Sequence, residues 1–141
     1  MKSFSMKVLA MLLVVPSSLY AIESMVSESP AGASAYIVSP KDGDTIGENV
    51  TVVFGLRGMG VAPAGLNKAK TGHHHLIIDG KHLPALDKPM GKEVMHFGGG
   101  QTEKTIKLSK GTHTLQLMLG NYLHIPHNPP VMSEKITVTV K

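Results

Sequence analysis

Hydrophobic and polar residues alternate along much of the chain from about residue 36 onward. Successive side chains of a β-strand point to opposite faces, so a period of two predicts half-buried strands. The pattern predicts strands at 36–38, 50–56, 106–108, 115–119 and 136–140. We find no segment with helical spacing and capping residues at both ends.

One more strand is predicted at 73–79, where Leu76, Ile77 and Ile78 run into Asp79 and Gly80. Neither face of this segment is clearly polar, which favours a central position in a sheet. Asp-Gly between extended segments is typical of a two-residue hairpin turn. Three longer connections separate the strands, at 58–72, 84–101 and 121–132.

Six or seven short strands in about 105 residues are typical of an all-β protein. We therefore expect an antiparallel immunoglobulin-like β-sandwich of about seven strands, with a small barrel as the alternative. This is an expectation of architecture only, because the Cys and Trp residues of antibody domains are absent. Function is expected in the long connections, since loops on a rigid scaffold commonly carry binding residues.

The first 21 residues have the three-part pattern of a secretory signal peptide. Lys2 and Lys7 precede an apolar run at 8–15, and small residues lead to Ala21. An N-terminal membrane anchor is the alternative, but the run is shorter than the roughly 20 residues that a membrane-spanning helix needs. We expect a signal peptide at 1–21, a flexible Ser/Ala/Gly-rich leader at 22–35 and the β-sandwich domain at 36–141, in the periplasm or secreted. No membrane span is expected after cleavage.

The amino-acid composition excludes several kinds of functional site. The 141 residues contain no cysteine, which excludes disulfides, zinc fingers, iron–sulfur sites and thiol catalysis. Loss of Lys2 and Lys7 with the signal peptide leaves 12 basic and 10 acidic residues, a net charge of +2. No cluster of Lys and Arg with interleaved aromatic residues remains, so nucleic-acid binding is not expected.

The chain contains eight histidines, and all lie beyond residue 21. His73 and His75 are two positions apart on a predicted strand, so their rings project from one face and their Cα atoms are about 6.6 Å apart. Two imidazoles at this spacing can bind one metal ion together. Hydrogen bonding of these rings to the backbone at a strand end is the alternative.

Three further histidines lie in or beside the long loops. His124 and His127 belong to a loop stiffened by three prolines, and His96 precedes three consecutive glycines. The proline-rich loop with His124 and His127 could instead be a rigid surface turn without a ligand role. We expect His113 to be a hydrogen-bonded residue at the edge of the core, and His82 to be solvated.

These observations predict a metal site formed by His73, His75, His96, His124 and His127, which would bind copper or zinc. Four of the six methionines beyond residue 21 lie in or beside loops (Met59, Met90, Met95 and Met132). Thioether and imidazole together suit copper, particularly Cu(I), although methionine is also ordinary core material.

Two other functions compete with metal binding. In the first, the protein is a scaffold or interaction module of the cell envelope, an envelope protein is its partner, and the histidines are structural. In the second, it is a metal-dependent hydrolase with an open coordination position. We expect no enzyme, because the chain has no Gly-x-Ser-x-Gly elbow and no phosphate-binding loop, and Ser109 lies beside a lysine.

Several motifs resemble a family of small exported bacterial domains of unknown function. They are Gly72-His73-His74-His75, His96-Phe97-Gly98-Gly99-Gly100-Gln101, Gly111-Thr112-His113 and His124-Ile125-Pro126-His127. The resemblance covers nearly all of residues 36–141. It implies one compact exported domain, and it supplies no catalytic residue.

Overall fold

The computed structural model describes residues 24–141, which form nine strands and no helix. The strands are β1 (Ser34–Ser39), β2 (Thr45–Ile46), β3 (Asn49–Arg57), β4 (Gly60–Val61), β5 (Thr71–Ile78), β6 (Met95–His96), β7 (Glu103–Lys107), β8 (Gly111–Gly120) and β9 (Ile136–Val140). The predicted all-β class is therefore confirmed. The predicted signal peptide, residues 1–21, lies outside the described residues. No helix in residues 24–141 is long and apolar enough to cross a membrane.

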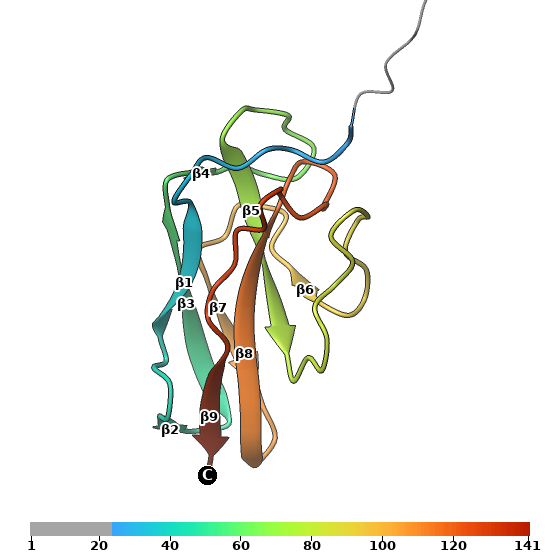
Figure 1. Cartoon of the computed structure of the whole chain (residues 1–141). Helices are drawn as coiled ribbons and strands as arrows, with labels where there is room; N and C mark the ends of the chain where they lie inside the picture. The colour runs from blue at the N-terminus through green and yellow to red at the C-terminus, as the bar shows by residue number, and fades with distance from the viewer. Residues whose placement is uncertain (1–23) are drawn as a thin grey trace, which may run out of the picture.

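The strands form two sheets that face each other (Figure 1). One sheet has three strands in the order β1-β3-β7, and the other has the order β2-β9-β8-β5-β4, with β6 also paired to β5. Most pairs are antiparallel, but the short pairs β2–β9 and β4–β5 are parallel. The strands beyond the predicted ones are the two-residue strands β2, β4 and β6, which are too short to produce a hydropathy pattern.

The space between the sheets is filled by the predicted apolar faces. Val52 and Phe54 of β3 pack against Leu76 of β5 and against the β8 leucines in one buried cluster. Full burial of each large apolar side chain stabilises the fold by about 1.5–3 kcal/mol. The alternating pattern therefore corresponds to a real inner face.

Strand β5 lies in the interior of the larger sheet, as its sequence predicts. It pairs with β8 from His73 to Ile78, and its other edge pairs with β4 and β6. Leu76 faces the other sheet, whereas Ile77 belongs to a second, outer cluster that consists of Ile77, Met90, Val94 and Met118, with Met132 packed against it. We call this the outer cluster. The segment that carries β6, yellow in Figure 1, lies on this outer side of β5 and β8.

The predicted two-residue hairpin at Asp79 and Gly80 is wrong. Only Asp79 has a positive φ, of 53°, and the antiparallel partners of β5 are β6 and β8 rather than a strand directly after Gly80. The Asp79 carboxylate instead accepts hydrogen bonds from the Thr114 N–H and from His113. This Asp-Gly pair therefore begins a long connection that crosses the outer face of the sheet.

The segment 22–35, expected as a flexible leader, is paired with the domain in its described part. Ser27 and Ser29 exchange backbone hydrogen bonds with Asn128, and the Asn121 side chain donates to the Met25 carbonyl. Strand β1 begins at Ser34, before the predicted boundary at 36. Backbone pairing needs no particular side chain, so a Ser- and Gly-rich composition did not reveal it.

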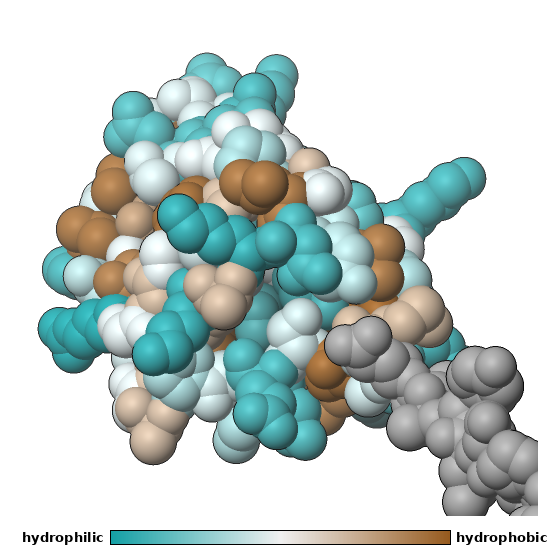
Figure 2. All heavy atoms as spheres, turned by 90° about the horizontal axis from the view of Figure 1, so that it is seen from above, coloured by the Kyte–Doolittle hydropathy of each residue, from teal (hydrophilic) through white to brown (hydrophobic). Residues whose placement is uncertain are grey.

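Figure 2 views the molecule from the end at which strand β5 begins. Hydrophilic residues cover much of this end, and hydrophobic residues form separate patches between them. The methionines at the centre of the outer cluster, Met90 and Met118, are instead buried.

Candidate metal centre

Strand β5 places His73 and His75 on the outer face of the larger sheet. Both residues are 0% exposed. Across the strand pair, His73 lies opposite Gly120 and His75 lies opposite Met118. The ring centroids of the two histidines are 4.5 Å apart, which confirms that they share a face.

A tight turn at the end of β8 brings His124 to these rings. The Asn121 side-chain oxygen accepts hydrogen bonds from the N–H groups of Leu123 and Ile125, and the Asn121 carbonyl accepts one from His124 N–H. His124 has a φ of 64°, in the left-handed region that residues other than glycine seldom adopt. Such backbone persists where the surrounding structure holds it, and it is common at functional sites.

One ring nitrogen from each of His73, His75 and His124 lies within 4.8 Å of the other two. His124 Nδ1 is 2.9 Å from His73 Nε2 and 3.4 Å from His75 Nε2. Metal–nitrogen bonds of 2.0–2.1 Å in a tetrahedral site place ligand nitrogens about 3.3 Å apart. Two of the three nitrogen pairs are within a few tenths of an ångström of this value, and the third pair, at most 4.8 Å apart, would have to close by up to about 1.5 Å for the three histidines to hold one metal ion.

The environment keeps these imidazoles neutral. Burial, together with the neighbouring histidines, lowers the pKa of His73 to about 4 and that of His75 to about 3. Burial and the nearby His96 also lower the pKa of His124. Neutral imidazole is the form that binds metal ions, so the three side chains are ready as ligands at neutral pH.

The buried rings also have hydrogen-bonding capacity that is not used. Within the described part of the chain, the Nδ1 atoms of His73 and His75 are buried without a hydrogen-bond partner. Unpaired buried polar atoms are rare in folded proteins. The converging nitrogens, which are the Nε2 atoms of these two rings and Nδ1 of His124, form a donor set that fits a transition-metal ion.

His96 lies beside the group but is not one of the three converging histidines. It pairs with His75 across β5 and β6, and its ring centroid is 4.8 Å from that of His75 and 5.2 Å from that of His124. Its Nε2 donates to the Gly91 carbonyl at 2.8 Å, which leaves Nδ1 with a lone pair. His96 is exposed and therefore lies on the solvent side of the site.

His127, the fifth residue predicted from sequence, lies apart from the three converging nitrogens. Its Nε2 is 3.2 Å from the Thr71 carbonyl and its Nδ1 is 3.5 Å from the Leu119 carbonyl. Its ring also packs against Gly72. Both nitrogens thus face backbone oxygens, and the one N–H of the neutral ring can donate to only one of them. The ring lies between β5 and β8.

Sequence reasoning missed the glycine that makes room for the site. A Cβ on Gly120 would lie 2.5 Å from His75 Cε1 and 3.0 Å from Met90 Cε. Only glycine therefore leaves space for both side chains. Its position at the end of the apolar run 115–119 was a visible signal, because a glycine in a strand often marks a close approach.

A family model matches residues 52–141, more than half of the chain. The chain belongs to the DUF4399 family, a domain of unknown function. This agrees with the resemblance to a small domain family of unknown function. No curated protein and no solved structure matches the chain. The part that matches DUF4399 contains His73, His75, His96 and His124.

Another histidine cluster in this DUF4399 domain resembles a catalytic triad. His113 Nδ1 is 2.7 Å from the Asp79 carboxylate, and its Nε2 is 3.4 Å from Ser109 Oγ but 2.8 Å from the Ser109 carbonyl. The Asp79 and Ser109 hydrogen bonds raise the pKa of His113. A ring that donates from both nitrogens has no lone pair to activate Ser109, so the cluster ties the end of β5 to the start of β8.

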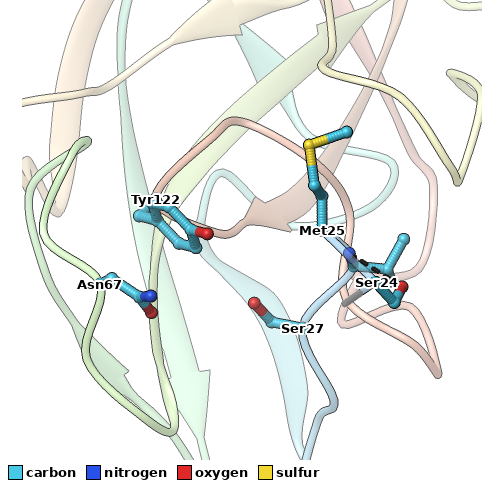
Figure 3. Close-up of a pocket in the computed structure, with 6 residues that line it drawn as sticks. Ser24, Met25, Ser27, Asn67 and Tyr122 are labelled. Carbon is cyan, nitrogen blue, oxygen red and sulfur yellow. Dashed lines mark hydrogen bonds between the residues drawn. The ribbon is translucent and has the colours of Figure 1, made fainter. Parts of the chain in front are cut away.

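A surface pocket of the domain lies apart from the histidines. Figure 3 shows it, with Asn67 and Tyr122 on one side and Ser24, Met25 and Ser27 on the other. Its volume is about 370 Å³, and no charged side chain lines it. It is separate from the residues that could bind a metal.

Proposed function

We propose that this protein is an exported binding protein for a transition-metal ion, copper or zinc, which is held by His73, His75 and His124. The observation that carries the proposal is the convergence of three ring nitrogens within 4.8 Å of one another in a buried site. His96, on the solvent side, would lie between the ion and the solvent or would bind the ion as a further ligand. The ion would be stored, delivered or sensed.

Hydrogen bonding explains this convergence less well than a metal does. A neutral imidazole has one N–H and one lone pair. Nitrogens of His73 and His75 both face the same Nδ1 of His124, which can complete one good hydrogen bond with only one of them. A cation bound through all three lone pairs would satisfy the three nitrogens at once.

The export part of the proposal rests on the N-terminal sequence. Residues 1–21 have the basic, apolar and small-residue pattern of a secretory signal. Mass spectrometry of the protein recovered from the periplasm or medium should show a mature chain that begins near Ile22. A chain that retains residues 1–21 in the cytoplasm would contradict export and leave metal binding untouched.

Calorimetric titration with Zn²⁺ and Cu²⁺ at pH 7.5 tests metal binding directly. The wild-type protein should bind one ion, and His124→Ala should bind it at least about 100-fold more weakly, since even partners outside the ligand set change affinity 10- to 100-fold. His82→Ala is the matched control, because His82 is exposed on the loop after β5. If the wild-type protein binds neither of these ions, and does not bind Cu(I) under reducing conditions either, the proposal is wrong.

A further inference from the structure

Methionine side chains line the inner wall of the histidine site. Met90 and Met118 belong to the outer cluster, are almost fully buried, and Met132 packs against them. Met118 lies opposite His75 on β8, and it also forms a β-bridge with Met132. The buried side of the three histidines therefore consists of thioethers and aliphatic groups.

The end of the Met90 side chain borders the same small space as the His75 ring. The Cβ position above Gly120 is 2.5 Å from His75 Cε1, the ring carbon bonded to the converging Nε2, and 3.0 Å from Met90 Cε. Met90 and the edge of the His75 ring therefore lie on the same side of Gly120.

The backbone of Met90 is tied to one of the candidate ligand residues. Its N–H donates to the His124 carbonyl at 2.9 Å. This bond holds the Met90 loop against the turn that positions His124. The Met90 side chain has three rotatable bonds, so its sulfur can turn toward a bound ion without movement of the backbone.

We infer that the site selects Cu(I) over Zn²⁺ and that the Met90 thioether is an additional ligand beside His73, His75 and His124. This inference rests on the proposed function. Thioether sulfur is a soft ligand that suits Cu(I), whereas Zn²⁺ gains less from it. The group of three converging residues contains no carboxylate.

Charge favours the same metal. Three imidazoles and a thioether are neutral, so bound Zn²⁺ would keep its two positive charges and Cu(I) only one. The cost of transferring an ion into an apolar medium rises with the square of its charge. A wall of Met90, Met118, Ile77 and Val94 therefore disfavours the dication far more than the monocation.

The test compares Met90→Leu with Met59→Leu. Leucine has nearly the volume of methionine, so both variants should fold with a loss below about 1.5 kcal/mol. Met59 packs against the inner core, away from the outer cluster, and serves as the control. Affinity is measured by competition with a coloured Cu(I) chelator under anaerobic, reducing conditions and with a coloured Zn²⁺ chelator.

The wild-type protein should bind Cu(I) more tightly than Zn²⁺. Met90→Leu should weaken Cu(I) binding about tenfold or more while it changes Zn²⁺ binding little, and Met59→Leu should change neither. X-ray absorption of the Cu(I) protein should show a sulfur neighbour that Met90→Leu lacks. Metal binding that Met90→Leu leaves unchanged, or weakens equally for both ions, would overturn this inference but not the proposed function. A wild-type protein that binds neither ion would overturn both.

Discussion

The two faces of strand β5 carry the same residue type in very different surroundings. His74 points into the sandwich, where its ring centroid is 5.2 Å from that of Phe54. His73 and His75 point to the outer face, where they meet each other and His124. All three β5 histidines are buried, and each has an Nδ1 atom without a hydrogen-bond partner among the described residues.

Burial alone therefore does not distinguish a candidate ligand from a core residue. Desolvation lowers the pKa of His74 to about 4, as it does for His73. The difference lies in what each ring faces, because the His74 ring packs against the Phe54 ring whereas other imidazole nitrogens converge near His73 and His75. Convergence of lone pairs, rather than burial or a shifted pKa, identifies the candidate site.

The largest expected effect is on metal affinity, and it should differ between substitutions on the outer and the inner face of β5. His75→Leu should weaken metal binding by more than about 100-fold, because it removes a ligand. His74→Leu makes the same chemical change on the inner face and should leave affinity within about twofold of wild type, since its ring faces the opposite side of the sheet and is not one of the three converging ligands. Chelator competition measures both. Equal losses in the two variants would mean that the outer face is not the metal site.

The pH dependence of stability should involve both faces. Unfolded histidine binds a proton near pH 6.5, whereas folded His73 and His74 do so only near pH 4 and His75 near pH 3. Between these values the unfolded state holds more protons, so stability of the metal-free protein should fall as the pH drops from 6.5 toward 4.

At pH 5 each of these histidines should lower the free energy of unfolding of the metal-free protein by up to about 2 kcal/mol relative to pH 7. Urea unfolding at pH 7 and pH 5 measures the loss, and His74→Leu should reduce it because one of the three groups is absent. An unfolding free energy that is the same at both pH values would contradict the buried neutral state of the histidines.

Gly120 should be important for stability and metal binding because it has no side chain and so leaves room for the His75 ring on the outer face. Gly120→Ala would place a Cβ 2.5 Å from His75 Cε1, so it should destabilise the protein by about 1–3 kcal/mol and weaken metal binding. A Cβ on the exposed Gly47 meets nothing within 4 Å, which makes Gly47→Ala the matched control. Thermal unfolding of both variants tests this, and similar melting temperatures would show that the His75 ring is not confined.

The smallest effect should come from the far end of β5, away from the candidate metal site. Asp79 hydrogen bonds lower the pKa of its carboxyl group, and the same pair raises the pKa of His113. The pair thus stabilises the fold between the carboxyl pKa and the His113 pKa, and its contribution is lost on either side of that window. Asp79→Asn should reduce stability at pH 6 by no more than about 1 kcal/mol, because the pair is partly exposed. Metal affinity should not change, and a clear loss of affinity would show that the two ends of β5 are coupled.

Much of the fold was predictable because alternation is a local property. The period-two pattern at 50–56, 115–119 and 136–140 corresponds to the inner faces of β3, β8 and β9. The short strands β2, β4 and β6 carry no such pattern, since they are held by backbone bonds to longer neighbours. The pairing of Ser27–Ser29 with Asn128 was hidden for the same reason.

The sequence by itself determined that His73 and His75 share one face of a strand and that His74 faces the other way, because side-chain direction alternates along any extended backbone. It also determined the family, and it excluded thiol ligands. Only the tertiary structure decided that His124 meets that face, that His127 bonds backbone carbonyls instead, and that Gly120 and Met90 shape the space beside His75. These contacts join residues far apart in the chain, so they depend on how the sheet and its loops pack, which no local pattern records.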